Sequence, residues 1–115
     1  MGTLHYGASR TSIRIDDRVL AHLQAVITAK LRRGEGFLVQ WERPPESGSG
    51  RGAVWVHPNC DLIYDYDGGR EPSLDHEELD RMMSAASGSR GLRINADHSS
   101  RDISVAEKRR PSAVA

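Results

Sequence analysis

Two kinds of side chain in this sequence have the chemistry to contact a nucleic acid. Lys30, Arg32 and Arg33 are close neighbours, and Arg43 and Arg51 stand on either side of a run rich in glycine and serine. Cationic side chains bind phosphate oxygens, and the flat face of an exposed tryptophan stacks on a base. The candidate nucleic-acid-binding residues are Lys30, Arg32, Arg33, Arg43, Arg51 and Trp55, with Trp41 on a neighbouring strand.

The same residues also have a structural explanation. Cations at the end of a helix complement its dipole, and tryptophans on a half-buried sheet usually belong to the core. The chain carries 16 Lys and Arg residues against 16 Asp and Glu residues, so its formal net charge is zero. Domains that bind nucleic acid are usually more basic. We therefore favour the structural explanation for the set and keep nucleic-acid binding as a hypothesis.

A second stretch, from Asp65 to Arg70, reads DYDGGR. ATP-dependent nucleic-acid ligases carry a motif of the form Lys-x-Asp-Gly-x-Arg, in which the lysine attacks the α-phosphate of ATP. Here Asp65 stands at the lysine position, and no lysine occurs between Lys30 and Lys108. Two glycines after an aspartate are typical of a tight turn that leaves a strand. We therefore predict a turn at this position and no lysyl-AMP chemistry.

Other candidate sites are weaker. His57 and Cys60 are separated by a turn-like stretch and could form a thiolate–imidazole pair, but no third group to orient the histidine can be identified. The five histidines lack the spacing of a metal site. The run 47–52 lacks the helix and the Lys-Ser/Thr pair of a P-loop, so it is interpreted as a hairpin loop. The sequence predicts no catalytic residue, no metal and no cofactor.

Length and composition limit the class of protein. A chain of 115 residues with 37% hydrophobic residues can form one small domain with a two-layer core, and it is too short for a complete ligase nucleotidyltransferase domain. The amino terminus has no apolar signal region, and no segment is long and apolar enough to span a membrane. With one cysteine, Cys60, no internal disulfide can form. We expect a cytoplasmic protein without a membrane partner.

The hydrophobic pattern predicts an α+β domain with the element order β-β-α-β-β-β-α-β. Strands are expected at 3–6, 12–15, 36–41, 53–57, 62–66 and 91–95, the third to fifth forming an antiparallel meander. Asp16 or Asp17 is expected to cap a first helix that ends before Gly34, and Asp75 a second that ends near Gly88. The expected result is one antiparallel sheet of about five or six strands with two helices on one face.

The domain is expected to span residues 1–95, followed by a disordered polar tail at 96–115. Most of its core is expected from residues at helix and strand periods. These are Val19, Leu20, Leu23, Val26, Ile27, Leu31, Phe37, Val39, Val54, Val56, Leu79, Met82 and Ile94.

Three runs carry a family resemblance: 20–41, 48–58, and the stretch from 72–79 to 91–94. Together they resemble a small actinobacterial domain of unknown function, whose short members are often labelled "ATP-dependent DNA ligase". The resemblance covers about residues 1–94 and implies an association with DNA ligation or repair. It carries no functional residues onto this sequence.

The functional hypothesis is a non-catalytic accessory or binding module that meets a nucleic acid or a DNA-repair protein. The first alternative is a protein–protein interaction module that uses a sheet edge or the tail. The second is a ligase-like nucleotidyltransferase, as the label implies, which the missing motif lysine disfavours. The sequence predicts no oligomeric state.

Overall fold

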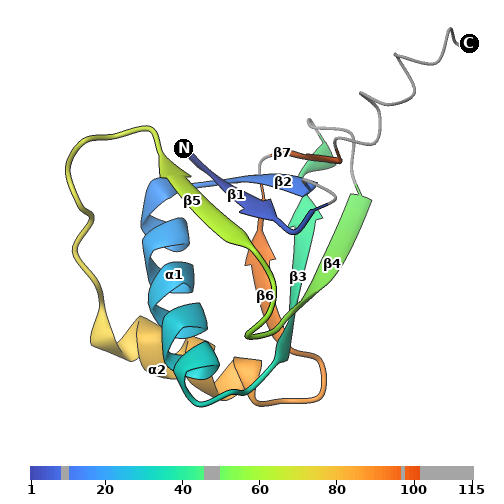
Figure 1. The fold of residues 1–115 in the computed structure, drawn as a ribbon. Helices are drawn as coiled ribbons and strands as arrows, with labels where there is room; N and C mark the ends of the chain where they lie inside the picture. Colours follow the sequence, from blue (N-terminus) through green and yellow to red (C-terminus); the bar gives the residue numbers. More distant parts are fainter. Residues whose placement is uncertain (9–10, 46–49, 97, 102–115) are drawn as a thin grey trace, which may run out of the picture.

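The computed structural model describes residues 1–8, 11–45, 50–96 and 98–101. Seven strands and two helices lie in this part of the chain (Figure 1). In order they are β1 (Gly2–Tyr6), β2 (Thr11–Ile15), α1 (Asp17–Arg32), β3 (Phe37–Arg43), β4 (Gly50–Val56), β5 (Leu62–Tyr66), α2 (His76–Ala86), β6 (Leu92–Asn95) and β7 (His98–Arg101).

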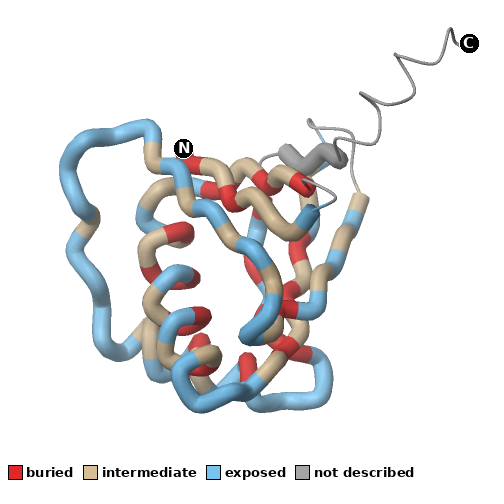
Figure 2. The backbone as a smooth tube through the Cα atoms, viewed as in Figure 1, coloured by how far each residue is buried: buried red, intermediate tan, exposed pale blue. Residues whose placement is uncertain are grey.

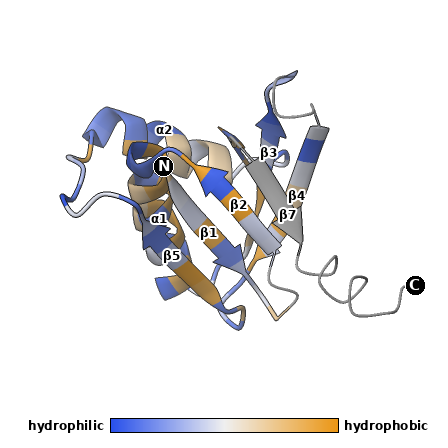
Figure 3. Cartoon of the chain, turned by 90° about the horizontal axis from the view of Figure 1, so that it is seen from above, coloured by the Kyte–Doolittle hydropathy of each residue, from blue (hydrophilic) through white to orange (hydrophobic). Residues whose placement is uncertain are grey.

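The strands form two sheets. Sheet A has the order β5-β1-β2-β7 and is antiparallel throughout, and sheet B has the order β4-β3-β6. In sheet B, β3 pairs antiparallel with β4 and parallel with β6. Viewed from above, the helices lie to one side and the β3–β4 hairpin to the other (Figure 3). The predicted α+β class and the predicted order of the first eight elements are confirmed.

The predicted single antiparallel sheet is wrong in two respects. Strand β5 does not continue the meander beyond β4: it pairs with β1, matching Leu62 with Tyr6 and Tyr66 with Gly2. This pairing turns the half-buried Tyr64 toward the core and leaves Ile63 exposed. In addition, α2 returns the chain to the end of sheet B where β3 begins, so β6 runs parallel to β3. Alternation predicts which side chains are buried but not which strand is the partner.

Each helix begins at the expected aspartate. The carboxylate of Asp16 accepts a hydrogen bond from the backbone N–H of Arg18, and that of Asp75 accepts one from Glu77. An N-cap of this kind satisfies a backbone donor that has no partner within the helix. Helix α1 contacts β1, β5 and α2, whereas α2 contacts β3 and β6. The two helices therefore link the two sheets through one core.

The core lies where the helices face the two sheets (Figure 2). Nine of the predicted core residues are buried, and Val19, Leu31, Val54 and Leu79 are half-buried at its margin. The core also contains buried residues outside the predicted set: Leu4, Ile13, Ile15, Trp41, Ala86, Leu92 and Ala96. Most of them lie on β1, β2 and β6, because the short strands are buried on one face.

The described structure extends beyond residue 95, the predicted end of the domain. Ala96 is buried, and its backbone N–H donates to the Glu42 carbonyl. Strand β7 then pairs with the edge of β2. Backbone pairing does not depend on apolar side chains, so a polar sequence could not reveal this strand. The remainder of the predicted tail, 102–115, lies outside the described residues.

Candidate functional site

The two tryptophans lie on opposite faces of sheet B. Trp41 pairs with Gly52 and points inward, where only 5% of its surface is exposed. An added Cβ at Gly52 would lie 2.3 Å from the Trp41 ring, so the glycine allows the indole to cross the strand. Trp55 pairs with Leu38 on the other face and is 56% exposed. Trp41 is therefore a core residue, and Trp55 alone presents an open aromatic face.

The sheet B outer face consists of the side chains that point away from the core: Leu38, Gln40, Glu42, Arg51, Ala53, Trp55, Arg93 and Asn95. Arg51 pairs with Glu42 across the strands and is exposed. Arg93 Nη2 lies 3.3 Å from Glu42 Oε2. This face thus combines one exposed indole with two guanidinium groups and one carboxylate.

Trp55 has two close contacts, one at its backbone and one at its ring. The Tyr6 hydroxyl donates a hydrogen bond to the Trp55 carbonyl. An added Cβ at Gly36 would lie 3.0 Å from the indole, so Gly36 lies directly against the ring. The ring is therefore exposed on one side and contacts Gly36 on the other, which leaves a face for stacking with a planar ligand.

Lys30 and Arg43 are not on this face. Lys30 is only 5% exposed, and its ammonium donates to Glu35 Oε1 at 3.1 Å and to Ser87 Oγ at 2.6 Å. Lys30 therefore joins the ends of the two helices, and its buried ammonium is already paired within the domain. Arg43 is half-buried and lies over Gly50, on the inward side of the hairpin rather than beside Trp55.

The remaining two predicted cations separate at the end of α1. Arg33 is the exposed C-cap residue, three residues before Gly36, and so lies at the Trp55 end of sheet B. Arg32 instead lines a cavity on another side of α1. The structure therefore divides the predicted set, with Arg33, Arg51 and Trp55 on or near the sheet B outer face.

In the DYDGGR stretch, Asp65 and Tyr66 end β5, and residues 67–70 bend away from the strand to begin a segment that crosses α1. Residues 67–74, here called the strap, are tied to the first turns of that helix. Asp17 Oδ2 accepts from Gly68 N–H at 3.0 Å, and Arg18 donates to the Ser73 carbonyl at 3.2 Å. The Gly68 N–H is the main reason that the pKa of Asp17 lies below its usual range. The strap is therefore anchored near both of its ends.

His22 completes this anchoring. The buried ring donates from Nδ1 to the Arg18 carbonyl at 2.7 Å, and Nε2 accepts from Asp75 N–H at 2.9 Å. Both nitrogens are used by the neutral imidazole, so His22 has a structural role at the start of α2.

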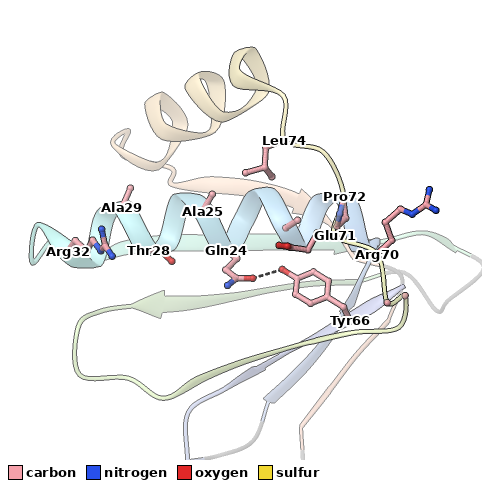
Figure 4. A pocket seen from close by; sticks show the side chains of 13 residues that line it. Gln24, Ala25, Thr28, Ala29, Arg32, Tyr66, Arg70, Glu71, Pro72 and Leu74 are labelled. Atoms are coloured by element: carbon pink, nitrogen blue, oxygen red, sulfur yellow. Dashed lines mark hydrogen bonds between the residues drawn. The ribbon is translucent and has the colours of Figure 1, made fainter.

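Between the strap and α1 lies a cavity of about 490 Å³, here called the α1 groove (Figure 4). Ala21, Ala25 and Ala29 line the helix side, and Leu74 and Tyr66 lie on the opposing walls. The Tyr66 hydroxyl donates to Gln24 Oε1 at 2.6 Å. Burial, with the nearby carboxylates of Asp17 and Glu71, raises the pKa of that hydroxyl, so it remains a donor at neutral pH.

A group of three hydrogen-bonded polar side chains lies on the outer face of sheet A. His5 Nε2 is 2.9 Å from Asp65 Oδ2, and His5 Nδ1 is 3.2 Å from Ser12 Oγ. This order of groups resembles an activated serine. However, Ser12 is on a strand paired on both sides, so its neighbouring backbone N–H groups serve the sheet and form no oxyanion hole. We interpret the three residues as a cross-strand hydrogen-bond chain.

The other sequence candidates have structural roles. His57 Nδ1 accepts from Asn59 N–H at 3.2 Å, and the His57 carbonyl accepts from Cys60 N–H, so this stretch is a turn. In the described ranges, no group of three or more His, Cys, Asp or Glu side chains is placed to hold a metal ion. Neither α1 nor α2 is long and apolar enough to cross a membrane.

Comparison with known proteins adds one result. A family model described as "Domain of unknown function (DUF7882)" matches residues 1–97. The chain belongs to the DUF7882 family. No curated protein and no solved structure matches the chain. Both the sheet B outer face and the α1 groove lie within the part assigned to the DUF7882 domain.

Sequence reasoning missed Arg93 and the α1 groove of this DUF7882 domain. Arg93 alternates with the apolar Leu92 and Ile94, so its exposure was readable, but its position beside β3 was not. For the groove, the available signal was the spacing of Ala21, Ala25 and Ala29 on one face of α1. That spacing does not reveal that the strap crosses the same helix.

Proposed function

We propose that this DUF7882 domain is a non-catalytic binding module that holds single-stranded nucleic acid on the sheet B outer face. The observation that carries the proposal is the exposed ring of Trp55 on the outer face of sheet B. An exposed indole offers a face for stacking, and bases stack on such rings without regard to sequence. A link to DNA ligation or repair, suggested by the resemblance to ligase-labelled actinobacterial proteins, belongs to this proposal.

The cations supply the second part of the interface. A strand stacked on Trp55 would pass Arg51 four residues earlier on β4, and Arg33 lies toward the other end. Arg93 is partly neutralised by Glu42 and should contribute less. Because the formal net charge is zero, binding depends on these local groups and should be weak and sensitive to salt.

Fluorescence anisotropy with labelled single-stranded and nicked duplex DNA tests the proposal, at low salt and then across a salt series. Trp55→Ala should weaken binding roughly tenfold, since base–aromatic stacking contributes about 1–3 kcal/mol, and Trp55→Phe should restore part of it. Arg81→Ala is the control, because Arg81 is an exposed arginine on α2 that pairs with Glu78. Absence of binding at low salt, or equal loss in the Arg81 variant, would overturn the proposal.

A protein-interaction module is the second candidate. Strand β4 is an edge of sheet B, and an edge strand with an exposed Trp55 can accept a strand from a partner. Such a partner would be retained by the Arg32/Arg33 double alanine variant, because backbone pairing does not need those charges.

The ligase-like nucleotidyltransferase is disfavoured by the residues present. The motif lysine is replaced by Asp65, and Lys30 is buried in its own ion pair. Incubation with α-labelled ATP and Mg²⁺ should give no covalent protein–AMP, and a labelled band would reverse this conclusion.

A further inference from the structure

The α1 groove has a shape and a charge that the nucleic-acid proposal does not use. Its cavity of about 490 Å³ falls within the roughly 300–1,000 Å³ typical of small-molecule sites. Along α1 it extends from Ala21 to Arg32, roughly 16 Å at the helical rise. It therefore accommodates an elongated small molecule rather than a globular partner.

The groove floor is apolar and remains open for a structural reason. Ala21, Ala25 and Ala29 are too small to fill the space beneath the strap. The strap cannot collapse onto them, because Asp17, Arg18 and His22 hold its two ends over the first turns of the helix. Leu74, which is 45% exposed, adds an apolar wall. An apolar body can thus bury surface here without rearrangement of the chain.

The two ends of the groove differ in charge. Arg32 lies at one end and forms no ion pair within the described residues, and Arg70 and Glu71 lie at the other (Figure 4). At the Arg32 end no carboxylate lines the cavity. An acidic head group would therefore meet a guanidinium that no carboxylate neutralises, whereas a cationic head group would be repelled.

From this geometry we infer that the α1 groove binds an amphipathic organic anion. Its apolar body lies on the alanine floor against Tyr66 and Leu74, and its carboxylate, sulfonate or phosphate group pairs with Arg32. The inference is independent of nucleic-acid binding, because the groove and the sheet B outer face share no residue.

The test uses the full chain with 8-anilinonaphthalene-1-sulfonate, an apolar aromatic body with one anionic group. The expected result is saturable fluorescence enhancement with about one site per chain. Decanoate should displace the dye and decylamine should not. Displacement of the dye by both amphiphiles alike, or non-saturable binding, would overturn the inference.

Three variants locate the site. Ala25→Trp fills the floor and should abolish binding, whereas Ala85→Trp, on the exposed side of α2, should not. Arg32→Ala should weaken binding roughly tenfold, since hydrogen bonds to charged groups contribute about 1.5–3 kcal/mol. Arg33→Ala removes the same charge one residue away and should leave binding unchanged, as should Trp55→Ala.

Amide chemical shifts provide a readout that needs no variant. Titration of the labelled wild-type protein with decanoate should shift the amides of Ala25, Ala29, Gly68 and Gly69 and leave those of β4 unchanged. Shifts confined to sheet B, or binding of an acidic peptide where decanoate fails, would contradict a small-molecule site in the groove.

Discussion

The α1 groove and the sheet B outer face are the two surfaces of this domain best suited to a ligand, and they are built in different ways. The sheet B outer face follows from alternation along β3, β4 and β6, so its exposed side chains are set by local structure. The groove exists because hydrogen bonds from α1 hold the distant strap above a row of alanines. The first surface should tolerate mutation of its exposed residues, and the second should depend on a few anchoring contacts.

The largest expected effect comes from the buried counterpart of Trp55. Trp41→Ala should lower the free energy of unfolding by about 3–5 kcal/mol, because a large ring is removed from the core. Trp55→Ala should lower it by less than about 1 kcal/mol, because the ring is mostly in solvent. Urea unfolding followed by circular dichroism measures both. Equal losses in the two variants would contradict the assignment of opposite faces.

Loss of an anchor should have an intermediate effect. His22→Ala removes the acceptor for Asp75 N–H and the donor to Arg18, and we expect a loss of about 2 kcal/mol, in the range for buried hydrogen-bonding groups left unpaired. Hydrogen exchange should accelerate at the amide of Asp75 and at the adjoining end of the strap, and stay slow in β3. Uniform acceleration across the domain would mean that His22 supports the core rather than the strap.

Asp17, which anchors the other end of the strap, should contribute less to stability than His22, and its contribution should depend on pH. The folded-state pKa of Asp17 is lowered, so its contribution to stability is present above the unfolded-state pKa and is lost as pH falls through the folded-state value. Wild-type stability should therefore decrease below about pH 4 more steeply than that of Asp17→Asn. Unfolding curves collected from pH 7 to pH 2 measure this difference, and parallel pH profiles would rule out the anchor.

The smallest effect on stability separates the two surfaces most directly. Arg32→Ala and Arg33→Ala should each change the free energy of unfolding by no more than about 0.5 kcal/mol, since both side chains are exposed. Arg32→Ala should weaken anion binding roughly tenfold and Arg33→Ala should leave it unchanged. Oligonucleotide binding should weaken in Arg33→Ala and stay unchanged in Arg32→Ala. If each variant loses both the anion and the oligonucleotide, Arg32 and Arg33 serve the same binding surface. The assignment of Arg32 to the α1 groove and of Arg33 to the sheet B outer face would then be incorrect.

Signals within a few residues predicted the helices and strands. The exposure of the candidate site residues depended instead on contacts between distant parts of the chain. The aspartates that begin each helix and the apolar stripe of α1 were readable because caps and periodicity act over a few residues. Whether Trp55 was buried depended on the hairpin register, which places it three pairs from Trp41 and on the opposite face. Lys30 was assigned to the surface because nothing near it in sequence indicates Ser87, its partner on α2.

The pairing pattern of the strands also has a consequence for how the chain acquires its structure. Gly2 pairs with Tyr66, and Val39 pairs with Leu92, so each sheet joins residues from both halves of the sequence. Contacts between distant residues close large loops before they yield stabilisation, and they slow folding. When the segment through β4 has left the ribosome, sheet A still lacks β5 and β7, and sheet B still lacks β6. We expect the domain to fold only after β6 has emerged, in one late cooperative step.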